Sequence, residues 1–543
     1  MKVKVIIPSI LFCLLFNIVS GQNITQTIKG KVIDKVTQIP LPGATIAIIG
    51  TNPLIGASTD ANGEFVIKNV SVGRYNIKVN FIGYEPMIIN EVLVGSGKEV
   101  FLTAEIKESL VNMKEVVIRV NKEDPLNSMT TVSARQLNVE ESSRYAGGFD
   151  DPARLASSFA GVSSNLGNNG IVIRGNSPKG LLWQMEGVEI SNPSHFANIT
   201  SFGAGAITAL SSQMLANSDF FTGAFPSEYG NALSGVFDIK LRTGNNEKRE
   251  NTFQAGLVGI DLSSEGPLNK NKKSSYLFNY RYSTFALLAP ILPPEMGKLK
   301  YQDLSFKINL PTKKSGVFSF WGISALDYQG RDAVKDSSSW KSDIDKQKYS
   351  TNLFMYAIGI NHKIIIGSNT YISSTFSPTG YGLSLNQKSY NENNMIVPTN
   401  KIDNYIWKYT FTSFINHKFN SKHSNKTGII LNRLQYNLNI QKADSNQTSL
   451  LTYVDDHGSS YLLQAYSQSK YNFTNDLALN IGVHSQIFTL NNRFSIEPRI
   501  GLSWIFLPHQ VLGISYGLHS QLEMLHLNLL CQHQIFWANH LLL

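Results

Sequence analysis

The residue pattern that most resembles a catalytic motif lies near the end of the chain. Residues 513–517 read Gly-Ile-Ser-Tyr-Gly, which satisfies the nucleophile-elbow pattern of serine hydrolases. That motif needs a sharp turn between a strand and a following helix, so that the serine is exposed at the turn. Here Ser515 lies inside a run of alternating polar and apolar residues, and no helical pattern follows. We therefore predict a strand at this position and no nucleophile.

Two other groups have the residue types of metal ligands without the spacing. Asp60, Asn62 and Glu64 offer oxygen ligands, but the regular ligand order of a calcium loop is missing. His526, Cys531 and His533 lack the fourth ligand of a closed tetrahedral zinc site. Neither paired carboxylates nor a Gly-rich phosphate or dinucleotide loop is visible. The sequence thus predicts no catalytic residues, no metal and no cofactor, and hence a protein that is not an enzyme.

Length and charge narrow the class further. The chain has 543 residues, so two or more folded units are expected. Charged residues make up 16% and aromatic residues 10%, and 48 Lys and Arg against 39 Asp and Glu give a net charge of +9. The positive charges are dispersed, which argues against a nucleic-acid partner. Weak attraction to an anionic lipid surface is the better interpretation.

Residues 1–21 have the features of a secretory signal peptide. Lys2 and Lys4 precede a mostly apolar run at residues 5–16, and small residues precede a cleavage site after Gly21. The apolar run is too short to span a bilayer comfortably. No later stretch reaches about eighteen apolar residues, so any membrane span of the mature chain must be built from strands.

Residues 28–104 predict a seven-strand β-sandwich. Apolar residues alternate with polar or small ones, as in Phe65 and Ile67 or Ile77 and Val79. Residues 60–63, Asp-Ala-Asn-Gly, carry hairpin-turn chemistry, because Asp caps a turn and Gly supplies a positive φ. Residues 105–122 form a short extended segment with a few β-branched residues among polar ones. It suits a strand that pairs with a partner by edge addition, although spacing alone favours a last sandwich strand or a linker.

Residues 123–246 are rich in Gly, Ser and Asn and predict a small mixed α/β domain. Residues 151–160 have the pattern of a short helix with its apolar residues on one face. Residues 170–176 form a short strand that ends in a charged turn. Residues 181–190 form a strand pair that bends at Glu186 and Gly187.

Residues 247–526 alternate more regularly than any other part of the chain. Tyr276, Phe278, Tyr280 and Tyr282 point to one side of an extended chain, and the polar residues between them point to the other. The same alternation recurs at 304–310 and at 434–440, where we expect the apolar residues again on the outer face. About twelve such segments predict a partial antiparallel transmembrane β-barrel. A soluble β-sandwich is the alternative, although a second apolar set for an inner core is missing.

The order of these segments resembles that of TonB-dependent outer-membrane receptors with an N-terminal extension. Residues 28–104 resemble the carboxypeptidase-regulatory-like domain in four short pieces, at 30–34, 41–44, 59–65 and 81–84. Residues 123–246 resemble the plug domain of the family, although the plug dipeptide there usually begins with Asp rather than Glu. The plug-motif residues that the resemblance implies are Arg174, Gly175, Glu186, Gly187, Tyr229 and Gly230.

The resemblance also implies partners. A plug would fill a barrel too wide to be packed by its own side chains, surrounded by outer-membrane lipid. TonB would add a strand to a TonB box within residues 105–122, and an unidentified extracellular ligand would be carried inward. The TonB-box residues would be Glu115, Val116, Val117 and Ile118. Arg174 would either pair with a barrel carboxylate or hold the plug's own turn together, and the sequence leaves both open.

Two features depart from the family pattern. Receptor barrels have about 22 strands, against the twelve or so expected here. Residues 527–543 abandon the alternation. We expect a truncated receptor for energy-coupled uptake in the outer membrane. The alternative is a surface binding or adhesion protein that does not transport.

Overall fold

The computed structural model describes residues 24–110, 125–144, 151–164, 169–199, 203–256, 259–269, 273–288, 297–444, 449–507 and 510–523. The chain divides into two compact units, residues 1–122 and 123–543. No helix of the described residues is long and apolar enough to cross a membrane.

The first unit is the predicted sandwich of seven strands. One sheet has the order β4-β1-β7 and the other β3-β2-β5-β6, and their facing sides bury residues such as Ile28, Ile46 and Ile77. The Asp60 Oδ1 atom accepts the backbone N–H groups of Asn62 and Glu64, both at 2.8 Å, which confirms the turn. The strands are β1 Thr25–Asp34, β2 Thr45–Ile48, β3 Gly56–Ser58, β4 Glu64–Ser71, β5 Gly73–Asn80, β6 Met87–Val94 and β7 Val100–Ile106.

The second unit begins with the predicted mixed α/β domain, which we call the plug. Its main sheet has the order β12-β11-β16-β15-β8, and β9 pairs with β10 and β13 with β14. Asp151 caps α3 by accepting the N–H of Ala153 at 2.8 Å. The elements are β8 Ala134–Leu137, α2 Val139–Arg144, α3 Pro152–Ala156, β9 Val162–Ser164, β10 Ile171–Ile173, the 3₁₀ turn η2 Pro178–Gly180, β11 Leu181–Met185, β12 Val188–Glu189, β13 Ser194–His195, β14 Ile207–Thr208, β15 Ser218–Phe221 and β16 Gly235–Ile239.

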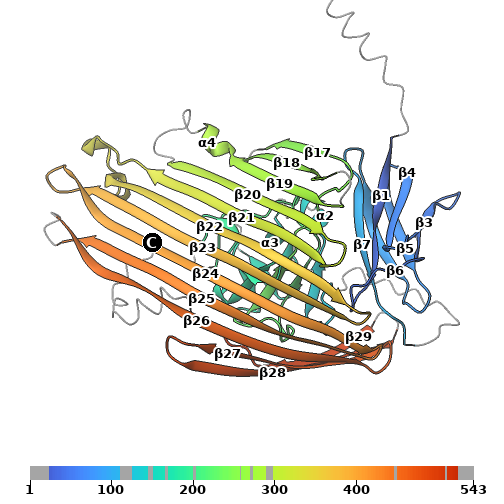
Figure 1. Ribbon diagram of the computed structural model, residues 1–543. Coiled ribbons are helices and arrows are strands. Elements are labelled where there is room, and N and C mark those ends of the chain that lie inside the picture. The colour runs from blue at the N-terminus through green and yellow to red at the C-terminus, as the bar shows by residue number, and fades with distance from the viewer. Residues whose placement is uncertain are drawn as a thin grey trace, which may run out of the picture. The chain divides into compact units, whose positions relative to one another are not determined.

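The rest of the second unit is one antiparallel sheet of 13 strands, β17 to β29 in chain order, which we call the wall. Its long central strands run side by side (Figure 1). Among the described residues β17 and β29 each have a single strand neighbour, so the sheet is open between them. The elements are β17 Glu250–Ala255, β18 Gly259–Pro267, β19 Ser275–Ser283, α4 Thr284–Leu288, β20 Lys298–Pro311, β21 Val317–Arg331, η5 Ser337–Ser339, η6 Asp343–Lys346, β22 Gln347–Ile366, β23 Thr370–Tyr390, β24 Ile396–Asn420, β25 His423–Ala443, β26 Leu450–Asn472, β27 Leu477–Phe488, β28 Arg493–Leu507 and β29 Gln510–Gly517.

The two faces of the wall follow the predicted alternation in β19. Phe278 is 40% exposed on the outer face, whereas its neighbours Leu277 and Asn279 are buried on the inner face. Ser515 lies in β29 and pairs with Gly501 of β28, as expected for a strand rather than a nucleophile elbow.

The prediction that the apolar residues of 434–440 lie on the outer face was wrong. Leu434, Leu438 and Ile440 of β25 are buried on the inner face, and Ile429 and Leu431 supply its outer apolar residues. β25 has 21 residues and is about 70 Å long at roughly 3.3 Å per residue. A transmembrane strand needs only about 9–11 residues. Half of β25 therefore lies beyond an apolar band of that height, and there the outer face can be polar.

Candidate functional site

The plug hairpin between β11 and β12 turns at the two motif residues Glu186 and Gly187. Met185 pairs with Val188, so the loop has only two residues, and their φ angles are +51° and +85°. Positive φ at both central positions is the geometry of a type I′ turn, which glycine adopts without strain. The backbone of this tight turn fixes where the Glu186 side chain points.

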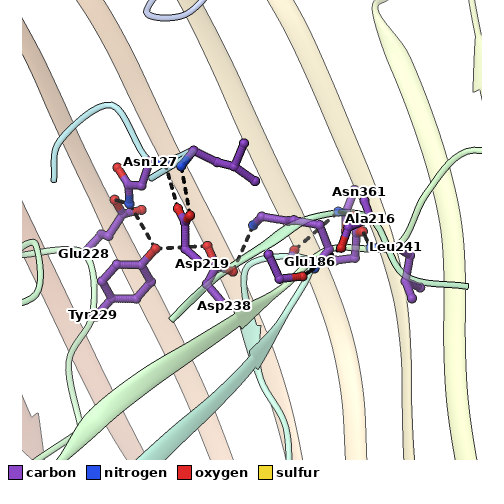
Figure 2. A network of polar contacts seen from close by, with 12 residues as sticks. Asn127, Glu186, Ala216, Asp219, Glu228, Tyr229, Asp238, Leu241 and Asn361 are labelled. Atoms are coloured by element: carbon purple, nitrogen blue, oxygen red, sulfur yellow. Dashed lines mark hydrogen bonds and ion pairs between the residues drawn. The ribbon is translucent and has the colours of Figure 1, made fainter. Parts of the chain in front are cut away.

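The Glu186 carboxylate ties this hairpin to the wall (Figure 2). It accepts the Leu241 N–H at 2.7 Å, the Lys307 ammonium at 2.9 Å and the Asn361 amide at 3.2 Å. Lys307 belongs to β20 and Asn361 to β22. Burial raises the pKa of the Glu186 carboxyl, but the charges of Lys307 and Lys240 outweigh burial and lower it overall. Glu186 is therefore a buried anion that pairs with a cation of the wall.

Arg174 does not make the first of the two contacts that the sequence left open, the ion pair with a barrel carboxylate. It follows β10 at φ +50° and its side chain is exposed. None of the carboxylates in the described ranges forms an ion pair with it. Its N–H donates to the Gly161 carbonyl at 2.8 Å, and Gly175 follows at φ +81°. The geometry fits the alternative, in which Arg174 and Gly175 shape the plug's own turn, and the plug–wall charge pair belongs to Glu186.

The second motif lies in a loop at residues 225–230, which we call the docking loop because side chains of the wall hold its backbone. The Arg499 guanidinium donates to the carbonyl oxygens of Pro226 and Tyr229, both at 2.7 Å. Gln468 accepts the Ser227 N–H at 2.6 Å. The remaining contacts are an ion pair from Lys426 of β25 to Glu228 and a 2.8 Å hydrogen bond between the His484 ring and the Ser227 carbonyl oxygen.

Gly230 ends the docking loop where no side chain fits. A Cβ atom at this position would meet the His484 imidazole and the Gln464 amide, both of which are buried side chains of the wall. Glycine is therefore required by a close approach to β26 and β27 rather than by its backbone angles.

Tyr229 connects the docking loop to the plug sheet (Figure 2). Its hydroxyl donates to Asp238 of β16 at 3.0 Å and accepts the Asn127 amide at 2.9 Å. Asn127 also donates to Glu228 at 2.7 Å. Burial, and next the charge of Asp238, raise the pKa of Tyr229 well above its ordinary value. Tyr229 thus stays a neutral donor at the centre of this network.

Two parts of the site escaped the sequence prediction. One is the segment at residues 125–133, which we call the strap: Asp219 of β15 accepts the N–H groups of Leu126 and Asn127 at 2.8 and 2.7 Å. Its residues are ordinary in type, so only the folded plug reveals them.

The other is His195 of β13, which is fully buried between two wall carboxylates. Its Nδ1 lies 2.5 Å from Asp327 and its Nε2 lies 2.9 Å from Asp303. Burial lowers the pKa of His195, but the hydrogen bonds to Asp303 and Asp327 outweigh burial and raise it overall. A positive charge on His195 thus links the plug to β20 and β21.

The TonB-box candidates Glu115, Val116, Val117 and Ile118 lie outside the described residues. So do the signal peptide at 1–21, the tail at 527–543 and the candidate ligands His526, Cys531 and His533.

Comparison with known proteins supports both units. Residues 28–118 match a family model described as the CarboxypepD_reg-like domain, and this match extends over the TonB-box candidates. No curated protein matches the chain in sequence. The fold is similar to the pyoverdine outer membrane receptor FpvA from Pseudomonas aeruginosa bound to pyoverdine, with a TM-score of 0.51 and 12% identity over 67% of this chain and 59% of that chain.

A second solved structure is equally distant. A mutant of the ferric enterobactin receptor PfeA from Pseudomonas aeruginosa, in complex with enterobactin, gives a TM-score of 0.50 and 12% identity. The match covers 73% of this chain and 64% of that chain, so the chain spans about three fifths of the length of these receptors. The expected regulatory-like domain and the receptor fold are confirmed.

Proposed function

We propose that this chain is a TonB-dependent receptor that takes up a substrate across the outer membrane. The observation that carries the proposal is the pairing of a 13-strand wall with an inner plug, which the wall holds by buried charged side chains. A plug of this kind blocks free diffusion through a wide barrel. A transporter must then move the plug, and that movement requires energy from another protein.

Outer-membrane lipid is the environment that the outer face of the wall requires. Large apolar side chains stand exposed on successive long strands, whereas soluble monomers rarely expose large contiguous apolar patches. A polar inner face with an apolar outer face is the pattern of a strand that separates lipid from a lumen. Examples are Ile358 and Ile360, Phe376, Phe411, Ile429 and Leu431, Tyr461 and Leu463, and Ile481 and Val483.

TonB is the proposed partner, and strand addition at Glu115, Val116, Val117 and Ile118 is the proposed contact. An extended segment joins a partner's sheet edge through its backbone N–H and C=O groups. Proline lacks the N–H group, whereas alanine keeps it. Val117→Pro should therefore abolish binding of the full chain to the periplasmic domain of TonB, and Val117→Ala should retain it, as measured by co-purification in detergent. Wild-type binding by Val117→Pro would refute the proposed contact.

The adhesion alternative makes a different prediction. A surface binding protein needs no TonB, so deletion of residues 114–118 would leave all of its activity intact. A receptor with the same deletion should still bind its ligand at the cell surface and should fail to carry it inward. The substrate is left unassigned, because pyoverdine and enterobactin are ligands of proteins only 12% identical to this one.

A further inference from the structure

The strap, residues 125–133, lies between the plug and one side of the wall. It contains no helix or strand. On the plug side, the Asp219 carboxylate accepts hydrogen bonds from the N–H groups of Leu126 and Asn127, and we call this contact the Asp219 clip. On the wall side, Lys470 of β26 donates to the carbonyl oxygens of Ser128 and Thr130 at 2.7 and 3.1 Å. Asn480 of β27 donates to the carbonyl oxygen of Met129. Side chains of other elements therefore make the main attachments of the strap backbone.

The strap continues directly into an edge strand. β8 is the outermost strand of the plug sheet and pairs only with β15 among the described strands. Asp219 stands opposite Gln136 in that pairing. The same strand, β15, therefore carries the carboxylate that holds the strap and pairs with the edge strand. An edge strand separates one residue pair at a time when it is pulled from its end. A central strand would have to break two ladders together.

The opposite side of the plug is attached to the wall by apolar packing in addition to the charged contacts of Glu186 and His195. Trp321, Ile323 and Met355 of the wall belong to the same buried cluster as Met185 and Ile239 of the plug. On the strap side the contacts are polar, and a cavity lies along this seam. That cavity is lined by strap, docking-loop and wall residues, among them Met129, Thr131, Phe225, Ser227, Asn480 and Arg499. Both sides of the plug make polar contacts with the wall, but only the side at β19–β22 adds the large apolar cluster, whereas the side at β26–β28 has the cavity.

We propose that the strap is the detachable part of the plug, that the Asp219 carboxylate is its release point, and that its departure opens the lumen along β26–β28 while the docking loop stays in place. This inference rests on the proposed function, since the strap begins at residue 125, a few residues after the TonB-box candidates at 115–118 on which TonB would pull. A pull from that side reaches the contact with Asp219 before it reaches β8, the first described strand of the plug.

Cysteine accessibility tests the release point without a known substrate. Met129 is fully buried in the strap, so Met129→Cys reacts with a small maleimide only when the strap leaves. Cys531 is replaced by serine in the full chain, which leaves this thiol alone in the mature protein. Asp219→Asn removes one of the two acceptor atoms, and a hydrogen bond to a charged group is strong. We expect labelling to accelerate by about tenfold or more.

Asp238→Asn is the matched control. Asp238 faces Asp219 across the β15–β16 pair and is similarly buried. Its hydrogen bonds go to the side chains of Tyr229 and Lys240 rather than to the strap backbone, so labelling of Met129→Cys should change less than about twofold. Ser227→Cys reports on the docking loop and should stay slow in Asp219→Asn. Equal labelling rates of Met129→Cys in Asp219→Asn and Asp238→Asn would refute the assignment of Asp219 as the release point. Fast labelling of Ser227→Cys in Asp219→Asn would mean that the whole plug loosens, and would overturn a separate strap.

Energy coupling separates this inference from the proposed function. In intact cells a protonophore should slow the labelling of Met129→Cys, and deletion of residues 114–118 should remove that difference. If Asp219→Asn accelerates labelling and the protonophore has no effect, the strap is detachable and the proposed function fails. If the protonophore acts and the two Asn variants behave alike, the function stands and the release point is wrong.

Discussion

The strap and the docking loop are both irregular segments of the plug that lie against the same strands of the wall, and a wall cation donates to two backbone carbonyls in each. They differ in their other attachments, because the docking loop also has an ion pair with the wall, whereas the plug's own Asp219 holds the strap. The docking loop receives a guanidinium, an ammonium, an imidazole and an amide from β25 to β28. The strap is held by the plug carboxylate of Asp219 and by carbonyl contacts with Lys470 and Asn480 of the wall, and its Asn127 amide also donates to the docking loop. The difference suggests that one segment anchors the plug while the other can leave.

The largest expected effect comes from breaking the anchor at Arg499. Arg499→Ala removes the donor to two docking-loop carbonyls and leaves the buried Glu497 carboxylate, its 2.6 Å partner, without this cation. Loss of one partner of a buried ion pair costs about 3–5 kcal/mol of the free energy of unfolding. Thermal unfolding in detergent should show this, and labelling of Ser227→Cys should become fast. Arg499→Lys keeps the charge but not the fork, so an intermediate effect is expected.

Gly230→Ala tests the close fit of the docking loop. The added methyl group would meet His484 and Gln464, and overpacking of this kind costs about 1–3 kcal/mol. The midpoint of thermal unfolding should fall accordingly. His484→Ala in the same chain should recover part of the loss, because residues in contact are energetically coupled. Purely additive effects of the two substitutions would contradict the contact.

Lys470→Met sharpens the comparison from the strap side. Methionine keeps most of the aliphatic stem but removes the ammonium donor to Ser128 and Thr130, a loss of about 1–2 kcal/mol. Labelling of Met129→Cys should accelerate while labelling of Ser227→Cys does not. A variant that loosens both segments equally would show that they are not separate attachments.

The smallest effect expected is the pH dependence of the His195 link. The pKa of His195 is raised in the folded protein, so protonated His195 stabilises the fold. That contribution is complete below the ordinary histidine pKa of about 6.5 and is lost as the pH rises through the raised value. Compared with His195→Gln, the wild type should lose thermal stability with rising pH, on the order of 1 kcal/mol. Parallel pH profiles would contradict a charged His195.

Much of the fold could be predicted because successive side chains of a strand point to opposite faces, so that the alternation of polar and apolar residues is visible in the sequence. The sandwich, the Glu186–Gly187 bend and the alternation of β19 depend on neighbouring residues and on backbone geometry, and each is confirmed. Residues 434–440 were assigned to the wrong face, because alternation gives the period of a strand but not which side is inner. That choice depends on how far the strand extends beyond the apolar band.

The sequence by itself determined the strand-rich composition, the two-faced wall and the glycine turns, because each depends on residues that are adjacent along the chain. Only the tertiary structure decided the partners of the plug. Glu186 meets Lys307, Arg499 meets the docking loop and His195 meets two aspartates across separations of more than a hundred residues. Which buried charges meet depends on how two independently formed sheets are placed, and no local pattern encodes that placement.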